Sequence, residues 1–160
     1  MLRSVIVFGM SAANEQKEQS HVLMLTVKAF NKIYELLQEV GEDHTLLRVY
    51  IQGGGCAGFE YGFEFDQNIA ADDWLMRHAM AGDSIDAETL KAASIQQSDI
   101  HSGPSYQQEK AIYVIIDAFS YPLLQGSTLD YVDDDPAGSR FIFKNPKAKR
   151  TCGCGASFST

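Results

Sequence analysis

Two segments of alternating polarity, joined by a glycine-rich turn, place the strongest constraint on how this chain folds. Over 47–52 and again over 59–66, every second residue is apolar or aromatic, which is the period of a strand with one face in a core. The turn between them, 53–58, contains four glycines around Cys56. Because glycine permits positive φ and close approach of the backbone to a bound group, this turn is expected to display the thiol. The aromatic residues of the second segment are expected to form its inner face: Phe59, Tyr61, Phe63 and Phe65.

The rest of the pattern predicts one clear helix and further strands. Apolar residues recur at helical spacing between Thr26, a suitable N-cap, and Gly41, a suitable stop, so an amphipathic helix is expected to pack on a sheet. Additional strands are predicted over 111–116, 127–132 and 139–144. This combination predicts an α+β domain that is mainly β.

Two stretches interrupt this pattern. Residues 77–110 are interpreted as an insertion, in which 86–97 is predicted to form a short helix. Asp117 can cap another short helix, and Pro122 restricts that helix to a single turn or kinks it, because proline has no N–H to donate.

Composition limits the number of domains and the kind of partner. The 160 residues, of which 45% are apolar, are typical of one compact domain, which we assign to 21–160 after a flexible N-terminal arm over 1–20. Residues 151–160 are predicted to be a mobile tail. Thirteen Lys and Arg against 21 Asp and Glu give a net charge of −8, which disfavours nucleic acid and membrane surfaces as partners.

The N-terminus and the cysteine count bear on location. The apolar run at the start ends at Gly9, shorter than the roughly 7 to 15 residues of a signal peptide core, and no stretch approaches the ~20 apolar residues of a membrane span. Three cysteines do not suit a secreted disulfide framework, so a cytoplasmic protein is expected. Residues 1–9 are interpreted as an extension upstream of a start at Met10, a hypothesis that an intact mass including Met1 or Leu2 would reject.

A second cysteine motif lies at the end of the chain, where Cys152 and Cys154 flank Gly153 and a further glycine follows. This spacing lets both sulfurs turn toward one metal or cluster. Thiolates are soft ligands that select iron–sulfur clusters, Zn²⁺ or Cu(I) over hard cations. Four basic residues precede the motif and either favour thiolates, form a docking contact or belong to a solvated strand end: Lys144, Lys147, Lys149 and Arg150.

The two motifs together, Gly53-Gly54-Gly55-Cys56-Ala57-Gly58-Phe59 and Thr151-Cys152-Gly153-Cys154-Gly155, resemble the HesB/IscA family of A-type iron–sulfur carriers. The similarity extends through 47–65 and 112–158. The triple glycine and its lead-in over 48–51 resemble the ErpA branch of this family more than the IscA or SufA branches.

The resemblance implies a compact HesB-like β-sandwich or pseudo-barrel with a helical insertion, and a homodimer or higher oligomer. It also implies a carrier without enzymatic turnover, which takes a [2Fe–2S] or [4Fe–4S] cluster from scaffold proteins and delivers the iron and sulfide to recipient apoproteins. The three metal ligands of the family fall on Cys56, Cys152 and Cys154. Common clusters take four protein thiolates and one chain offers three, so a second chain or another donor is expected to complete the site.

Other functions compete with the carrier. A thiol redox enzyme would use Cys152 and Cys154 as an exchange pair, but such enzymes favour Cys-x-x-Cys at a helix start. A store or sensor of mononuclear iron, or a structural zinc site, would use the three thiolates, although closed zinc sites normally have four ligands. A phosphate-binding loop at 53–58 is disfavoured, since no helix and no Gly-Lys-Ser/Thr ending follows.

Other polar residues are not predicted to form a site. The four histidines, His21, His44, His78 and His101, have no ligand spacing. Glu60 and Glu64 lie on one predicted strand, where a solvent-facing edge explains them as well as a carboxylate pair does.

Overall fold

Two β-sheets and two helices make up the part of the chain that the computed structural model describes. The described residues are 21–41, 46–54, 58–91, 110–133, 136, 138–151 and 157–159. In chain order the elements are β1 Leu23–Leu25, α1 Val27–Val40, β2 Leu46–Gly54, β3 Gly58–Asp66, β4 Trp74–Ala81, β5 Ser84–Lys91, β6 Ala111–Ile116, α3 Ser120–Leu124, β7 Ser127–Val132, β8 Arg140–Lys144, β9 Arg150–Thr151 and β10 Ser157–Ser159. The prediction of an α+β domain that is mainly β is confirmed.

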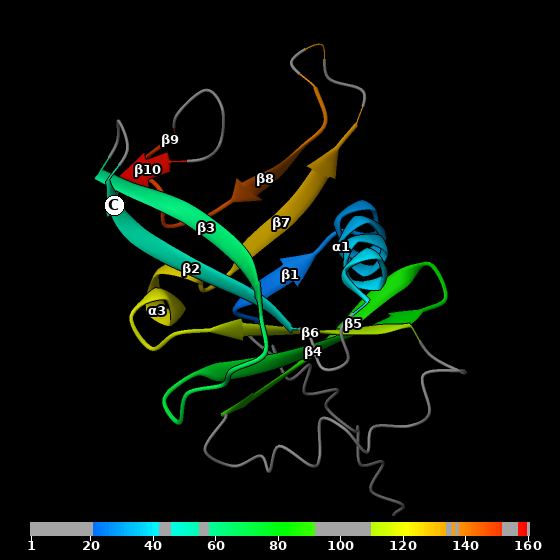
Figure 1. The fold of residues 1–160 in the computed structure, drawn as a ribbon. Helices are drawn as coiled ribbons and strands as arrows, with labels where there is room; N and C mark the ends of the chain where they lie inside the picture. The colour runs from blue at the N-terminus through cyan, green and yellow to red at the C-terminus, as the bar shows by residue number, and fades with distance from the viewer. Residues whose placement is uncertain are drawn as a thin grey trace, which may run out of the picture.

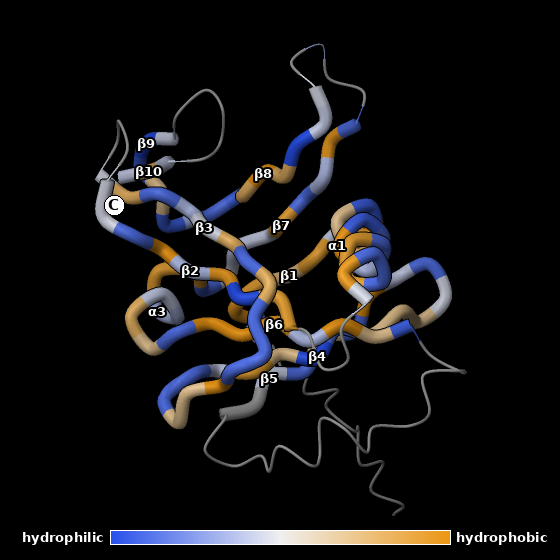
Figure 2. The backbone as a smooth tube through the Cα atoms, viewed as in Figure 1, coloured by the Kyte–Doolittle hydropathy of each residue, from blue (hydrophilic) through white to orange (hydrophobic). Residues whose placement is uncertain are grey.

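The larger sheet has the strand order β5-β4-β6-β2-β3-β10-β9, and the smaller has the order β1-β7-β8. The larger sheet curls around α1 and the smaller sheet (Figure 1). Hydrophobic residues concentrate where the layers meet, on β1, on β6 and on one side of α1 (Figure 2). None of the helices in the described ranges has the length and apolar character that a membrane crossing requires.

Helix α1 begins and ends where the sequence predicts. The Thr26 hydroxyl accepts a hydrogen bond from the Ala29 N–H at 3.2 Å, and Gly41 closes the helix with a φ of 64°. Phe30 and Ile33 are buried against the sheets. The predicted amphipathic helix is therefore confirmed.

The predicted strands in the centre of the larger sheet are also confirmed. Strand β2 lies between β6, to which it is parallel, and β3, to which it is antiparallel. Its inward residues Leu47, Val49 and Ile51 are buried. The strands predicted at 127–132 and 139–144 appear as β7 and β8, with β8 starting at Arg140.

The aromatic face of β3 is only partly buried. Tyr61 lies in the core, whereas Phe63 is 43% and Phe65 is 38% exposed, so the expectation of an inner position for all four aromatics is wrong for these two. The alternation itself is correct, because these aromatics lie opposite Ile51, Val49 and Leu47 of β2.

The insertion predicted from residue 77 begins inside a sheet strand. Strand β4 lies between β5 and β6, with Ala79 paired to Ala111, and its Met76 and His78 are buried. Residues 77–81 are therefore part of the larger sheet, and the bounds of the insertion stay a prediction.

The short helix predicted over 86–97 is wrong for the residues that are described, since Ser84–Lys91 is strand β5; 92–97 lie outside them. Gly82, with a φ of 64°, and Asp83 form a two-residue turn that returns the chain from β4 to β5. In β5 the partly buried residues recur at every second position from Ile85. Pairing with β4 thus overrode the helical propensity of this segment.

The single-turn helix predicted after Asp117 is confirmed as α3. The Asp117 carboxylate accepts hydrogen bonds from the backbone N–H groups of Phe119 at 3.0 Å and Ser120 at 2.9 Å. Pro122 lies in its middle, which agrees with the predicted limit on its length.

Candidate metal-binding site

The three cysteines predicted as ligands all lie outside the described residues, so the structure describes the elements that flank them. In the sequence, Cys56 falls between the last residue of β2 and the first residue of β3. Cys152 and Cys154 fall between β9 and β10. The ligand set therefore remains a prediction.

The hairpin of β2 and β3 is paired without interruption from Leu46 opposite Asp66 to Gly54 opposite Gly58. Gly54 has a φ of 146° and Gly58 a φ of 108°, values that residues with a side chain rarely adopt. A Cβ atom at either glycine would meet no atom within 4 Å. The two glycines are thus needed for their backbone conformation and not for space.

The C-terminal strand connects this hairpin to β9. Phe158 of β10 lies opposite Phe59 of β3 on one side and opposite Thr151 of β9 on the other. Because neighbouring strands are about 4.8 Å apart, the backbones of Thr151 and Phe59 are separated by roughly 10 Å. The segments that lead into both cysteine motifs therefore lie at one corner of the larger sheet (Figure 1).

Phe158 anchors this corner. Its side chain is fully buried, and its ring stacks on Tyr61 with centroids 4.5 Å apart and on Phe59 with centroids 5.5 Å apart. Tyr61 in turn stacks on Phe143 of β8 at 4.3 Å. The column of rings joins β10, β3 and β8.

The prediction of a mobile tail over 151–160 is wrong for Thr151 and Ser157–Ser159, which are strand residues. The physical reason is the burial of the Phe158 ring, whose transfer from water outweighs the fraying expected near a chain end. A three-residue strand is too short to show a period in the sequence, so no local signal identified it.

Helix α3 supports the middle of β2 and the approach to β9. The Ile51 N–H donates a hydrogen bond to the Ser120 hydroxyl at 2.8 Å, and that hydroxyl donates to Asp117 at 2.6 Å. The Asn145 amide donates to the Leu123 carbonyl at 2.9 Å. These bonds fix the segment between β8 and β9 to the same helix as β2.

The four basic residues before the second motif divide into two pairs. Lys144 pairs with Asp130 at 2.7 Å, and Lys147 donates hydrogen bonds to α3 and to the residue that follows it. Lys149 and Arg150 are exposed. Only the first pair therefore has a structural role in the described part of the fold.

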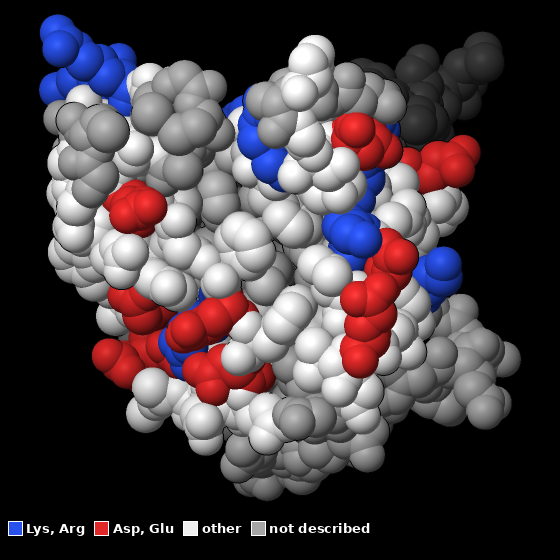
Figure 3. All heavy atoms as spheres, turned by 45° about the horizontal axis from the view of Figure 1, so that its top comes forward, with Lys and Arg blue, Asp and Glu red and all other residues white. Residues whose placement is uncertain are grey.

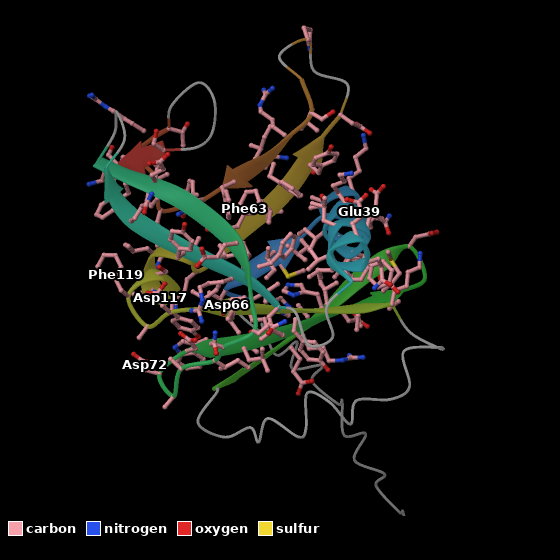
Figure 4. All side chains as sticks on the ribbon, viewed as in Figure 1. Glu39, Phe63, Asp66, Asp72, Asp117 and Phe119 are labelled. Atoms are coloured by element: carbon pink, nitrogen blue, oxygen red, sulfur yellow. The ribbon has the colours of Figure 1, made fainter. Side chains whose placement is uncertain are left out.

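At the opposite end of the hairpin, Arg48 of β2 forms a partly buried ionic clamp. Its guanidinium contacts Asp66 at 2.7 Å and Asp73 at 3.0 Å, and it also donates to the Asn68 carbonyl at 2.9 Å. Burial raises the pKa of Asp66, but hydrogen bonds from the Asn68 backbone and Arg48 hold the pKa below its usual value. The clamp fixes the turn between β3 and β4, where Asp66 and Asp72 are labelled in Figure 4.

His78 is explained by packing. It is fully buried in β4, and its Nε2 lies 3.0 Å from the Leu23 carbonyl oxygen. Burial lowers the pKa of His78 from 6.5 to about 4, so the ring is neutral at neutral pH. Among the residues that the structure describes, no group of three or more His, Cys, Asp or Glu side chains is arranged to hold a metal ion.

Comparison with known proteins identifies relatives that match most of the chain. The chain is 37% identical over 136 residues to a putative iron-sulfur cluster insertion protein ErpA of Paraburkholderia phymatum, and the match covers 85% of this chain and 86% of the relative. It is 41% identical over 137 residues to the iron-sulfur cluster insertion protein ErpA of Xanthomonas euvesicatoria, covering 86% and 82%. For the ErpA protein of Coxiella burnetii the identity is 33% over 150 residues, covering 94% and 99%. No family model matches the chain.

Two solved structures share the fold. A crystal structure of IscA with the [2Fe-2S] cluster matches with a TM-score of 0.55 and 24% identity, covering 86% of this chain and 96% of that one. A crystal structure of Escherichia coli SufA matches with a TM-score of 0.51 and 24% identity, covering 86% and 92%. The predicted HesB-like fold is thereby confirmed.

Proposed function

The chain belongs to the ErpA family of iron–sulfur cluster insertion proteins, and from this premise we propose that it carries a cluster on Cys56, Cys152 and Cys154. It acts as a carrier that inserts the cluster into apoproteins and does not turn over a substrate. The cluster is its cargo, so the site must both bind it and release it.

The arrangement of Thr151, Phe158 and Phe59 in one row across three strands is the observation that supports this proposal. Cys152 follows Thr151 directly, and Cys56 precedes Phe59 by three residues. One residue of extended chain spans at most about 3.6 Å, so the separation of roughly 10 Å between the flanking backbones is within reach of both motifs. Strand pairing alone thus keeps the two flanking segments within this distance of each other.

The ligand count favours an assembly of more than one chain. Three thiolates leave a [2Fe–2S] or [4Fe–4S] cluster one protein ligand short, and a homodimer or higher oligomer supplies the fourth. A cluster shared between chains is incompletely enclosed, which suits transfer from scaffold proteins to recipient apoproteins. Free thiols persist in a reducing compartment, so we place the carrier in the cytoplasm.

Anaerobic reconstitution with iron and sulfide tests the ligand set. The wild-type chain is expected to become brown, with charge-transfer absorption and a cluster signature in its Mössbauer spectrum. Cys56→Ser, Cys152→Ser and Cys154→Ser should each lose most of the bound iron and sulfide, because serine is a poor ligand for iron in such clusters. Thr151→Ser, next to Cys152, is the matched control and should retain both.

Transfer then separates a carrier from the competing functions. The loaded chain should activate an apoprotein under chelation faster than free iron and sulfide do. Full cluster binding by all three cysteine variants would contradict the proposed ligands. A disulfide reductase activity that requires Cys152 and Cys154 but not Cys56 would instead support a thiol redox enzyme.

A further inference from the structure

Most cations whose side chains the structure describes are engaged by the protein itself. Four of them form ion pairs: Lys28 with Asp133, Lys32 with Glu35, Arg48 with Asp66 and Asp73, and Lys144 with Asp130. Lys147 donates a hydrogen bond to α3, and the ammonium of Lys110 lies over the ring of Tyr34. Lys149 and Arg150 differ from these, because both are exposed and neither side chain forms a hydrogen bond, ion pair or ring contact with another residue of the described ranges. Their charge is therefore available to a partner.

The backbone of these two residues is fixed although their side chains are not engaged. The Lys149 N–H donates a hydrogen bond to the Ser159 carbonyl at 2.8 Å, and Arg150 lies opposite Ser159 in the pairing of β9 with β10. Strand β9 is the last strand of the larger sheet, so one of its edges is open in the described part of the chain. Figure 3 shows blue atoms projecting at the corner where β9 lies, without red atoms beside them.

We propose that Lys149 and Arg150 form a docking site for the acidic surface of a protein that exchanges the cluster with this chain. The inference rests on the proposed function, since its meaning depends on Cys152, which is two residues beyond Arg150. The chain as a whole carries a net charge of −8 and repels an acidic partner. A local pair of free cations reverses this repulsion at one corner, so the partner approaches with its acidic face toward the cysteine motifs.

Two other roles for Lys149 and Arg150 fit the observations less well. Nucleic-acid binding commonly uses about 6–10 phosphate contacts, and two cations on an acidic chain cannot supply them. Charged residues on an edge strand also prevent edge-to-edge aggregation, which would give Lys149 and Arg150 a purely protective role. A protective role predicts a change in aggregation, whereas docking predicts a change in the rate of transfer that depends on salt.

The test compares two double variants with the same change in net charge. Lys149→Gln with Arg150→Gln removes the free cations, and Lys28→Gln with Lys32→Gln removes two cations from α1. Each chain is loaded with cluster, its iron content is matched, and the second-order rate of transfer to the apo form of an acidic [2Fe–2S] ferredoxin is followed by circular dichroism. At roughly 20 mM salt the first variant should transfer about fivefold more slowly than wild type, and the difference should disappear near roughly 0.5 M salt, where charges are screened. The α1 variant should transfer at the wild-type rate.

Exchange of the two residues, Lys149→Arg with Arg150→Lys, keeps the charge and should keep the rate. Transfer by the Gln variant at the wild-type rate in low salt would overturn the docking site while leaving the proposed function intact. A loss that persists at high salt would also overturn it, because it would indicate a structural effect. A wild-type chain that takes up no cluster would contradict the proposed function itself, and the docking site with it.

Discussion

At one end of the β2–β3 hairpin, Arg48 donates hydrogen bonds to two carboxylates, whereas at the other end the strands close through Gly54 and Gly58 with no atom near either Cβ position. The clamp end is held by side chains, and Asp73 there is almost fully buried. The turn end is held by backbone pairing and, one strand away, by the ring of Phe158. Side-chain hydrogen bonds therefore concentrate at the clamp end, whereas the described residues on either side of the turn, Gly54 and Gly58, have open space at their Cβ positions.

This difference suits a carrier. A site that must accept and release a cluster needs a fixed base and an adaptable rim, since a fully enclosed site would release its cargo slowly. The aromatic column of Phe158, Tyr61 and Phe143 supplies the base beside the proposed site.

The largest effect is expected from removing the anchor of the turn end. Phe158→Ala should lower the free energy of unfolding by about 3–5 kcal/mol, because it deletes a fully buried ring that stacks on Tyr61 and Phe59. Phe63→Ala is the control, since Phe63 is 43% exposed, and it should cost about 1 kcal/mol or less. Urea unfolding measures both, and equal losses would mean that the corner is not anchored by Phe158.

The clamp end should respond to loss of one charge. Asp73→Asn should lower the free energy of unfolding by about 2–3 kcal/mol, because it removes a buried carboxylate and leaves the partly buried Arg48 guanidinium with one carboxylate in place of two. Asp72→Asn, at the exposed neighbouring position, should change it by less than about 0.5 kcal/mol. Thermal or urea unfolding that finds the two variants alike would show that the clamp does not stabilise the hairpin.

The clamp should also give the hairpin an acid-sensitive end. The pKa of Asp66 is depressed in the folded chain, so its contribution is present above the unfolded pKa of about 3.9 and is lost as the pH falls through the folded pKa. Asp66→Asn should therefore cost about 1.5 kcal/mol at pH 7 and progressively less below about pH 4. Buried His78, with a pKa of about 4, removes stability from both proteins between pH 6.5 and 4, so the difference between them isolates Asp66. A difference that stays constant from pH 7 to 2.5 would contradict this assignment.

Strands β2 and β3 and helix α1 could be predicted from the sequence because the signals for them are local. The alternation in β2 and β3 and the capping residues of α1 are properties of neighbouring residues. The glycines of the turn were expected to permit positive φ, and Gly54 and Gly58 adopt it. The cysteine motifs were recognisable for the same reason, since each is a short contiguous string.

The parts that the sequence did not predict depend on distant residues. Arg48 meets Asp73 across 25 positions, and nothing near either residue indicates the pairing. Strands β9 and β10 have two and three residues, and they exist because Phe158 is buried beneath the hairpin. The row that joins Thr151 to Phe59 follows from this tertiary contact, so the pairing of the strands that flank the two motifs required the structure.

The smallest effect is expected at the turn itself. Gly58→Ala should lower the free energy of unfolding by about 1 kcal/mol, because its φ of 108° is unfavourable for a residue with a Cβ, although no neighbour would clash with that atom. Gly53→Ala is the matched control, since Gly53 is equally open and has no positive φ, and it should change stability by less than about 0.5 kcal/mol. If the turn requires the backbone conformation of glycine and not its small size, Gly58→Ala and Gly53→Ala should differ in the free energy of unfolding measured in urea. A larger side chain at 58 should then lower that free energy little more than alanine does. A steep further loss from Gly58→Ala to Gly58→Leu would mean that the turn end is packed after all, and the contrast between the two ends of the hairpin would not hold.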